Sequence, residues 1–195
     1  MQELARVDAN TQLAAAAVSR AGRGNSASPL VQLSASLFFR EGAPRVIALV
    51  SCRSREGVSS LGRSFRDFLM GVGARVVLMQ AADCLVWPRG RSSFPAGTFR
   101  SGPSTSESFL AAKEDADVLL VDCASLETSP AVFMLAAHVD GVVLVVEDGR
   151  HSAREMRKAV KLIKDVNGVV LGVVLTNRKR PLPNWLYNLF SRRNR

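Results

Sequence analysis

The chain has 195 residues, of which 47% are hydrophobic and 22% charged. This is the length of one domain with an ordinary globular core, and it excludes a wholly disordered or collagen-like chain. Lys and Arg number 26 against 17 Asp and Glu, which gives a net charge of +9. Six of these cations and no acid lie in residues 178–195, so most of the basic excess belongs to the C-terminal tail.

No apolar run approaches the roughly 18–20 residues needed to cross a bilayer, and residues 1–6 have no signal-type apolar stretch. We therefore expect a cytoplasmic protein. The three cysteines, Cys52, Cys84 and Cys123, form no CxxC motif, and their odd number fits a reducing compartment. They follow three predicted strands and could share a metal or redox site, but small buried hydrophobic residues are the favoured interpretation.

Residues 1–28 contain a Gly-rich break at 22–26 and are predicted to be a flexible leader. Residues 29–39 have leucines at helical spacing, which predicts a short amphipathic helix. Five continuously apolar runs predict strands covered on both faces, over residues 45–51, 74–79, 117–123, 141–147 and 168–176. Helices are predicted over 59–72, 106–116, 129–137 and 152–166. This alternation over residues 29–180 predicts an α/β fold of three layers around a doubly wound, mostly parallel sheet.

Two segments lie outside this pattern. Residues 84–105 are rich in Pro, Gly and Ser and predict a long loop over the carboxyl edge of the sheet, where ligands bind in such folds. Residues 181–195 predict a basic, aromatic helix or tail. A lipid surface and a protein interface both suit this tail, whereas nucleic acid does not, because the body has no broad basic face and no nucleic-acid-binding motif.

The connection after the first strand, residues 51–60, has the position of a phosphate-binding P-loop. Such a loop holds phosphate with backbone N–H groups at a helix N-terminus and with a lysine after its last glycine. Val58 stands where that lysine belongs, and no lysine precedes Lys113. The alternative is a plain strand-to-helix turn. If a nucleotide binds, the candidate contacts are Arg53, Arg55, Gly57, Ser59 and Ser60.

Residues 53–60, RSREGVSS, resemble the RPGEGKST loop of the bacterial tyrosine kinases of capsule and exopolysaccharide synthesis, a group related to the septum-site and partition ATPases. Further segments resemble this family in the same order over residues 45–189. They are the second strand (75–79), the Walker B strand (116–122), the fourth strand (140–146) and a strand ending in an asparagine (171–178). The resemblance implies a P-loop NTPase-like fold, with Asn177 near adenine and Asp122 near magnesium.

The sequence departs from this family at its catalytic positions. Besides Val58, Gln80 replaces the aspartate that ends the second strand, and Tyr187 is the one tyrosine where the family has a tyrosine-rich tail. Each lost electrostatic contact typically lowers a rate by ~10²–10³. We therefore expect little or no catalysis, a vestigial metal position at Asp122, and either no cofactor or weakly bound ATP or ADP with magnesium.

The leading hypothesis is a catalytically defective, kinase-like regulatory or scaffolding subunit in exopolysaccharide or capsule biosynthesis and export. By resemblance, its partner is the cytoplasmic part of an inner-membrane chain-length regulator or co-polymerase. The resemblance also implies self-association through the face that would bind the nucleotide. One alternative is a weakly active ATP-binding autokinase or ATPase that uses Arg53 or Arg55. Another is a partition-type factor that touches the membrane peripherally through its basic tail.

Overall fold

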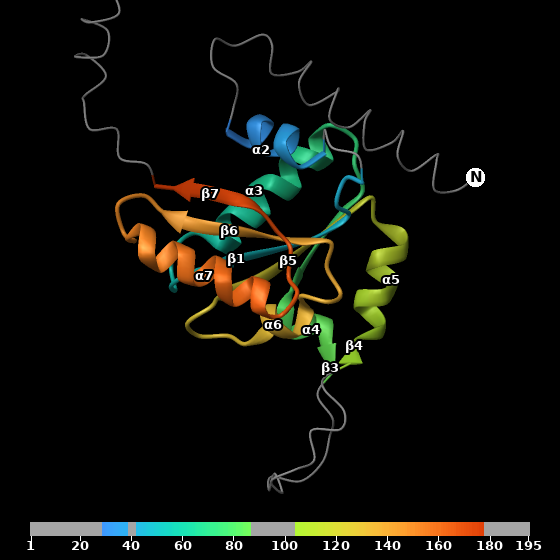
Figure 1. Cartoon of the computed structure of the whole chain (residues 1–195). Coiled ribbons are helices and arrows are strands. Elements are labelled where there is room, and N and C mark those ends of the chain that lie inside the picture. Colours follow the sequence, from blue (N-terminus) through green and yellow to red (C-terminus); the bar gives the residue numbers. More distant parts are fainter. Residues whose placement is uncertain (1–28, 39–41, 87–103, 178–195) are drawn as a thin grey trace, which may run out of the picture.

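The structure is a computed structural model that describes residues 29–38, 42–86 and 104–177 (Figure 1). The predicted leader (1–28) and the predicted tail (181–195) lie outside the described residues. Among the helices of the described ranges, none is both long and apolar enough to cross a membrane.

The five predicted strands form one sheet in which every pairing is parallel. Its order is β2-β5-β1-β6-β7, so β1 lies at the centre. The strand bounds are Val46–Ser51 (β1), Val76–Gln80 (β2), Val118–Ser125 (β5), Gly141–Glu147 (β6) and Val170–Thr176 (β7). The predicted bounds were within two residues of these at each end.

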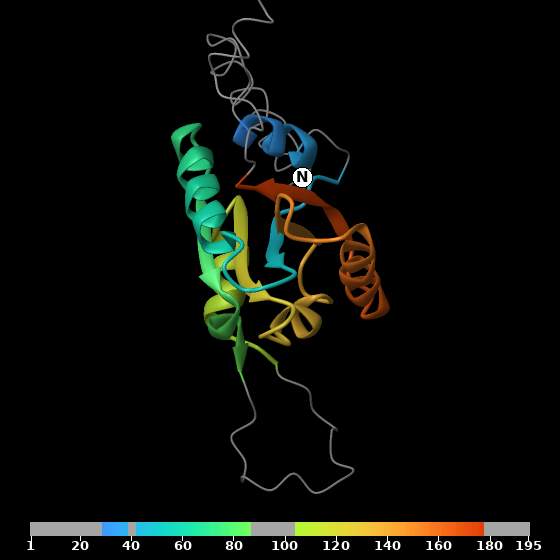
Figure 2. The ribbon, with the colours of Figure 1, turned by 90° about the vertical axis from the view of Figure 1, so that its left-hand side faces the viewer.

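Helices cover both faces of this sheet (Figure 2). Helices α2 (Pro29–Phe38) and α3 (Val58–Gly71) pack on one face. The other face is covered by α4 (Ala81–Cys84), α5 (Glu107–Asp115), α6 (Ala131–Leu135) and α7 (Ala153–Asp165). The predicted three-layer, doubly wound α/β fold is therefore confirmed.

The central strand shows why the apolar runs form this sheet. All six residues of β1 are buried, and successive side chains of a strand point to opposite faces. Ile47 and Leu49 pack with α3, while Ala48 and Val50 pack with the helices of the other face. A strand covered on both sides is expected to be continuously apolar, and the first five of the six residues of β1 are apolar.

The segment predicted as a long loop over residues 84–105 begins and ends with regular structure. Cys84 ends α4, and β3 (Leu85–Val86) pairs antiparallel with β4 (Ser104–Thr105). Strands of two residues are too short to leave a periodic pattern, so the sequence did not reveal this ribbon. Residues 87–103 lie outside the described part of the chain.

Candidate functional site

The candidate site lies at the carboxyl end of β1. This strand pairs with β5 on one side and with β6 on the other, so the chain winds outward in both directions from it. Ligands of doubly wound folds bind at such a switch point. The connection from β1 to α3, residues 52–57, crosses this point. Gly57 ends the connection with φ 87°, a left-handed conformation that glycine adopts without strain.

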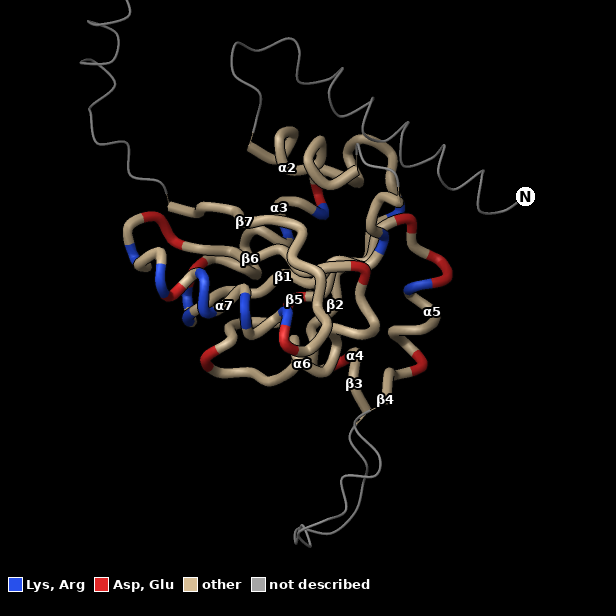
Figure 3. The backbone as a smooth tube through the Cα atoms, in the orientation of Figure 1, with Lys and Arg blue, Asp and Glu red and all other residues tan. Residues whose placement is uncertain are grey.

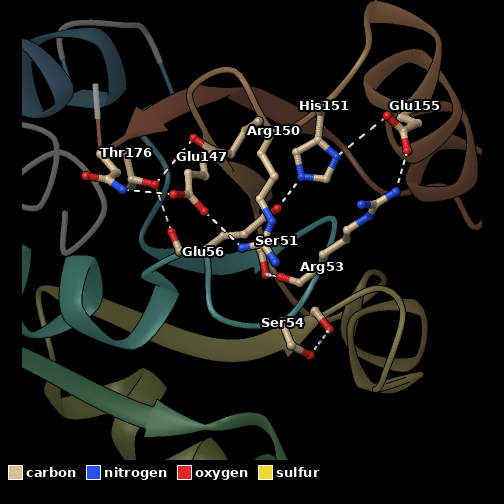
Figure 4. Close-up of polar contacts among 12 residues, drawn as sticks. Ser51, Arg53, Ser54, Glu56, Glu147, Arg150, His151, Glu155 and Thr176 are labelled. Carbon is tan, nitrogen blue, oxygen red and sulfur yellow. Dashed lines mark hydrogen bonds and ion pairs between the residues drawn. The ribbon is translucent and has the colours of Figure 1, made fainter. Parts of the chain in front are cut away.

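Side chains from three strands hold this connection in place (Figure 4). The Ser51 hydroxyl, at the end of β1, donates a hydrogen bond to the Arg53 carbonyl at 2.7 Å. Thr176, the last residue of β7, donates to the Glu56 carbonyl at 2.8 Å. The hydroxyls of Ser54 and Ser125 are 3.3 Å apart. Contacts with the ends of these three strands therefore hold the loop in its conformation.

Glu56 and His151 form a buried contact beneath the loop. The Glu56 carboxylate contacts His151 Nε2, and the side chains are 0% and 1% exposed. The second carboxylate oxygen of Glu56 and Nδ1 of His151 have no hydrogen-bond partner among the described residues. Nδ1 lies 4.0 Å from an oxygen of Glu155. A buried polar atom without a partner is costly, so the burial of these two atoms offsets part of the stabilisation that the contact contributes.

A cavity of about 370 Å³ opens in front of the loop. It is bordered by Gly57, Ser59 and Ser60, together with the cationic side chains of Arg55 and Arg63. No described side chain caps the N-terminus of α3, where the first N–H groups of a helix lack intrahelical partners and carry a partial positive charge. This combination suits a phosphate or another small anion.

Two side chains of the predicted phosphate loop, Val58 and Arg53, make contacts away from the cavity. Val58, at the lysine position, is 6% exposed and packs in the core beneath α3. It supplies no charge to the cavity. Arg53 turns away and pairs with Glu155 at 2.7 Å, and it does not border the cavity. Of the two arginines considered as substitutes, Arg55 alone lies at the cavity.

Asp122, the candidate magnesium ligand, is buried and already hydrogen-bonded. One carboxylate oxygen accepts from the Ala124 N–H at 3.1 Å, and the other lies 3.4 Å from the Gln80 amide nitrogen. An amide nitrogen that donates to the carboxylate occupies the direction from which a cation would approach, so these residues do not fit magnesium. Within the described ranges, no cluster of three or more His, Cys, Asp or Glu residues suits a metal ion.

A second cavity, of about 640 Å³, adjoins the first and shares Arg55, Glu56, Gly57 and Ser60 with it. Asn177, the candidate adenine contact, borders this second cavity. Its amide nitrogen donates to Glu147 at 2.8 Å, and Glu147 also pairs with Arg150 at 2.9 Å. The residues predicted to meet the two ends of a nucleotide are therefore brought to adjoining cavities, but Asn177 is engaged by a neighbouring acid.

The three cysteines lie on one face of the sheet, in or against a single apolar cluster. Burial raises the pKa of the Cys52 thiol to about 11 and of the Cys84 thiol to about 12. The pKa of Cys123 is also raised, again chiefly by burial. Thiols in such surroundings stay protonated and unreactive, which favours the interpretation of small buried hydrophobic residues.

Three features of the site were not found from the sequence. Arg63 follows Ser59 by four residues on α3, a spacing that puts both on one helix face and that could have identified it. His151 lies in the turn before α7, and nothing in its neighbourhood in the chain points to Glu56. The contact between Ser54 and Ser125 joins residues 71 positions apart, and no local pattern reveals such a pair.

Comparison with known proteins supports this fold. No protein-family profile and no curated protein sequence matches the chain. Among solved structures, the kinase domain of the Escherichia coli tyrosine kinase ETK matches with a TM-score of 0.58 at 10% identity, over 78% of this chain and 76% of that one. The chimerical protein CapA2B2 matches with a TM-score of 0.58 at 14% identity, over 83% and 89%.

The BceF tyrosine kinase domain matches with a TM-score of 0.57 at 17% identity, over 76% of this chain and 75% of that one. The same fold is therefore shared by proteins that differ from this chain at most positions. The chain has the fold of the bacterial tyrosine kinase domains, which confirms the fold that the resemblance implied.

Proposed function

We propose that this protein is a catalytically defective relative of the bacterial tyrosine kinases that acts as a regulatory or scaffolding subunit in exopolysaccharide or capsule biosynthesis and export. The observation that carries this proposal concerns two positions at which the tyrosine kinase family has charged residues and this chain has none. The lysine position holds a buried valine, Val58, and the acid before α4 is replaced by Gln80, whose amide meets Asp122. Phosphoryl transfer depends on those charges.

A weak affinity for phosphate-bearing ligands is part of this proposal. The N-terminus of α3, Ser59, Ser60, Arg55 and Arg63 border one cavity, and they supply N–H, hydroxyl and guanidinium donors to an anion. ATP or ADP would place its phosphates there without a magnesium ion at Asp122. Binding of this kind would shape the surface of the protein and would not support turnover.

The proposed partner is the cytoplasmic part of an inner-membrane polysaccharide chain-length regulator. This proposal is supported by the likeness of the fold to bacterial tyrosine kinase domains and by the family resemblance of residues 53–60. Self-association through the face that carries the two cavities is proposed on the same basis. Such a protein would work in the cytoplasm at the inner membrane.

A second candidate is a weakly active ATP-binding autokinase or ATPase. It is favoured by one observation, namely that Arg55 and Arg63 both border the cavity at the N-terminus of α3. A guanidinium is broader than an ammonium and binds phosphate in a different geometry, so we expect any such activity to be low.

Calorimetry and turnover measurements separate these candidates. Binding of ATP is measured with and without magnesium, together with phosphate release and tyrosine phosphorylation. The regulatory proposal expects weak binding that magnesium does not strengthen and no turnover above background. Turnover that is abolished by Arg55→Ala or Arg63→Ala, and retained by the matched control Arg66→Ala on the same helix, would instead establish the second candidate.

A further inference from the structure

The charges of the described residues are separated in space. These residues contain 13 Lys and Arg against 14 Asp and Glu, yet five of the cations lie on α7 with only two acids. The remaining described residues have eight cations and twelve acids. Figure 3 shows the basic residues following one another along α7. One helix is therefore basic on a body that is otherwise acidic.

The cations of α7 form a row on its outer face. Their spacing of three or four residues places them on one side of the helix, and all five are exposed: Arg154, Arg157, Lys158, Lys161 and Lys164. The first and last are ten positions apart, a rise of about 15 Å along a helix. On the opposite side of the helix, Ala159 and Ile163 are buried in the core.

This row has no acidic partner in the part of the chain that the structure describes. None of the five cations forms an ion pair with another described residue. Glu155, an acid of the same helix, is instead paired with Arg53 and completes the N-terminal capping box with Ser152. Hydrogen bonds from Ser152 lower the pKa of Glu155, which keeps it charged and engaged there.

Exposed apolar side chains lie beside the row. Leu162 of α7 is 40% exposed, and Val173 and Leu175 of the edge strand β7 are 48% and 53% exposed. These two residues of β7 pair with Leu144 and Val146, whose side chains belong to the core cluster on the α7 face. The exposed apolar residues of β7 therefore point to the same side of the sheet as α7.

We propose that the outer face of α7, together with Leu162, Val173 and Leu175, binds the surface of an anionic lipid bilayer. Lipid phosphates meet the row of long cationic side chains, and the apolar side chains enter the boundary between headgroups and acyl chains. The acidic remainder of the body is repelled by the same surface, which fixes the orientation.

An acidic protein segment is the rival occupant of this face. It would satisfy the cations but would leave Leu162, Val173 and Leu175 without an apolar environment. A bilayer supplies negative charge and an apolar layer together. The cations also line a convex helix surface without converging on one point, which suits many dispersed phosphates.

The test is co-sedimentation of the full chain with two kinds of vesicle, one of phosphatidylcholine alone and one of phosphatidylcholine mixed equally with phosphatidylglycerol. The test variant is Lys158→Gln/Lys161→Gln/Lys164→Gln, and the matched control Arg66→Gln/Arg75→Gln/Lys113→Gln removes three cations that lie outside α7 and outside the candidate phosphate cavity. Glutamine has nearly the helix propensity of lysine and arginine, and circular dichroism verifies that both variants fold.

The expected result is binding to the anionic vesicles and not to the neutral ones. The α7 variant should lose affinity by about a hundredfold at low salt, since each cation at an anionic surface contributes roughly fivefold. The control should change less than about threefold, because charges far from the surface are screened. A further variant, Leu162→Gln, should lower the affinity without changing its salt dependence.

Equal pelleting of the α7 variant and the wild-type chain would overturn the proposal and would leave the basic tail as the lipid contact. Absence of binding to anionic vesicles would overturn it as well. In that case, binding of polyglutamate that is lost in the α7 variant would assign the face to an acidic protein.

Discussion

Glu56, in the connection after β1, contacts His151, in the turn before α7, across 95 positions of sequence and in the interior of the protein. This contact ties the loop at the centre of the sheet to the helix that carries the basic row. Arg53 and Glu155 add a second, exposed link between the same two elements. The shape of the candidate phosphate loop therefore depends on α7.

The first prediction concerns this buried contact. His151→Ala leaves the Glu56 carboxylate buried without its partner, and the free energy of unfolding should fall by about 3–5 kcal/mol. The double variant Glu56→Ala/His151→Ala should be more stable than the sum of the two single changes predicts, with a coupling of at least about 1 kcal/mol. Urea unfolding measures all four proteins, and strictly additive effects would show that the two side chains do not stabilise one another.

The second prediction is a gain of function. Val58→Lys restores an ammonium group at the N-terminus of α3, and Gln80→Asp replaces the amide beside Asp122 with a carboxylate. The double variant should bind ATP at least about tenfold more tightly than the wild-type chain, and only with magnesium. Calorimetry measures the affinity, and Val58→Leu/Gln80→Asn is the control. A folded double variant without this gain would show that more of the site than these two charges has been lost.

The third prediction concerns thiol reactivity. Because the pKa of Cys52 is raised to about 11, only about one thiol in a thousand is ionised at pH 8, and the thiolate is the reactive form. Alkylation of Cys52 by iodoacetamide should therefore be slow at neutral pH and rise about tenfold per pH unit. Mass spectrometry should find Cys84 and Cys123 modified later still, since both are buried. Rapid labelling of Cys52 at pH 7 would contradict its burial.

The fourth prediction concerns stability in acid. Hydrogen bonds from the Arg75 guanidinium hold the pKa of Asp117 below its ordinary value of 3.8. A carboxyl whose pKa is lower in the folded state stabilises the protein above its unfolded pKa, and this stabilisation is lost as the pH falls through the folded pKa. Asp117→Asn should therefore be less stable at pH 7 and should lose less stability than the wild-type chain on acidification below pH ~3.8. Parallel pH profiles for the two proteins would contradict the assignment.

The fifth prediction tests the packing between β6 and β7. A Cβ atom added at Gly141 would lie 2.7 and 2.8 Å from the two methyl carbons of Leu171, which is closer than van der Waals contact. Gly141→Ala should therefore lower the free energy of unfolding by roughly 1–3 kcal/mol. Gly172→Ala is the matched control, because a Cβ there meets no atom of the described structure within 4 Å. Thermal unfolding compares the two, and equal stabilities would show that Leu171 moves aside freely.

The sequence by itself determined the layers of the fold and the position of the candidate site. A strand buried on both faces is apolar along nearly all of its length, as β1 is up to Val50 and β6 is up to Val146. An amphipathic helix repeats with its own period, as α7 does. These constraints act within a single strand or helix, so a pattern of consecutive residues reveals them. The replacement of the loop lysine by Val58 likewise follows from a single residue of the sequence.

The tertiary structure alone decided which residues meet. Arg53 and Arg55 are two positions apart and were equal candidates, yet one pairs with Glu155 and the other borders the cavity. The contacts of Glu56 with His151 and of Gln80 with Asp122 join strands and turns that are distant in the chain. Such pairs depend on strand order and register, because packing of the whole sheet brings these side chains together, and no stretch of consecutive residues records that arrangement.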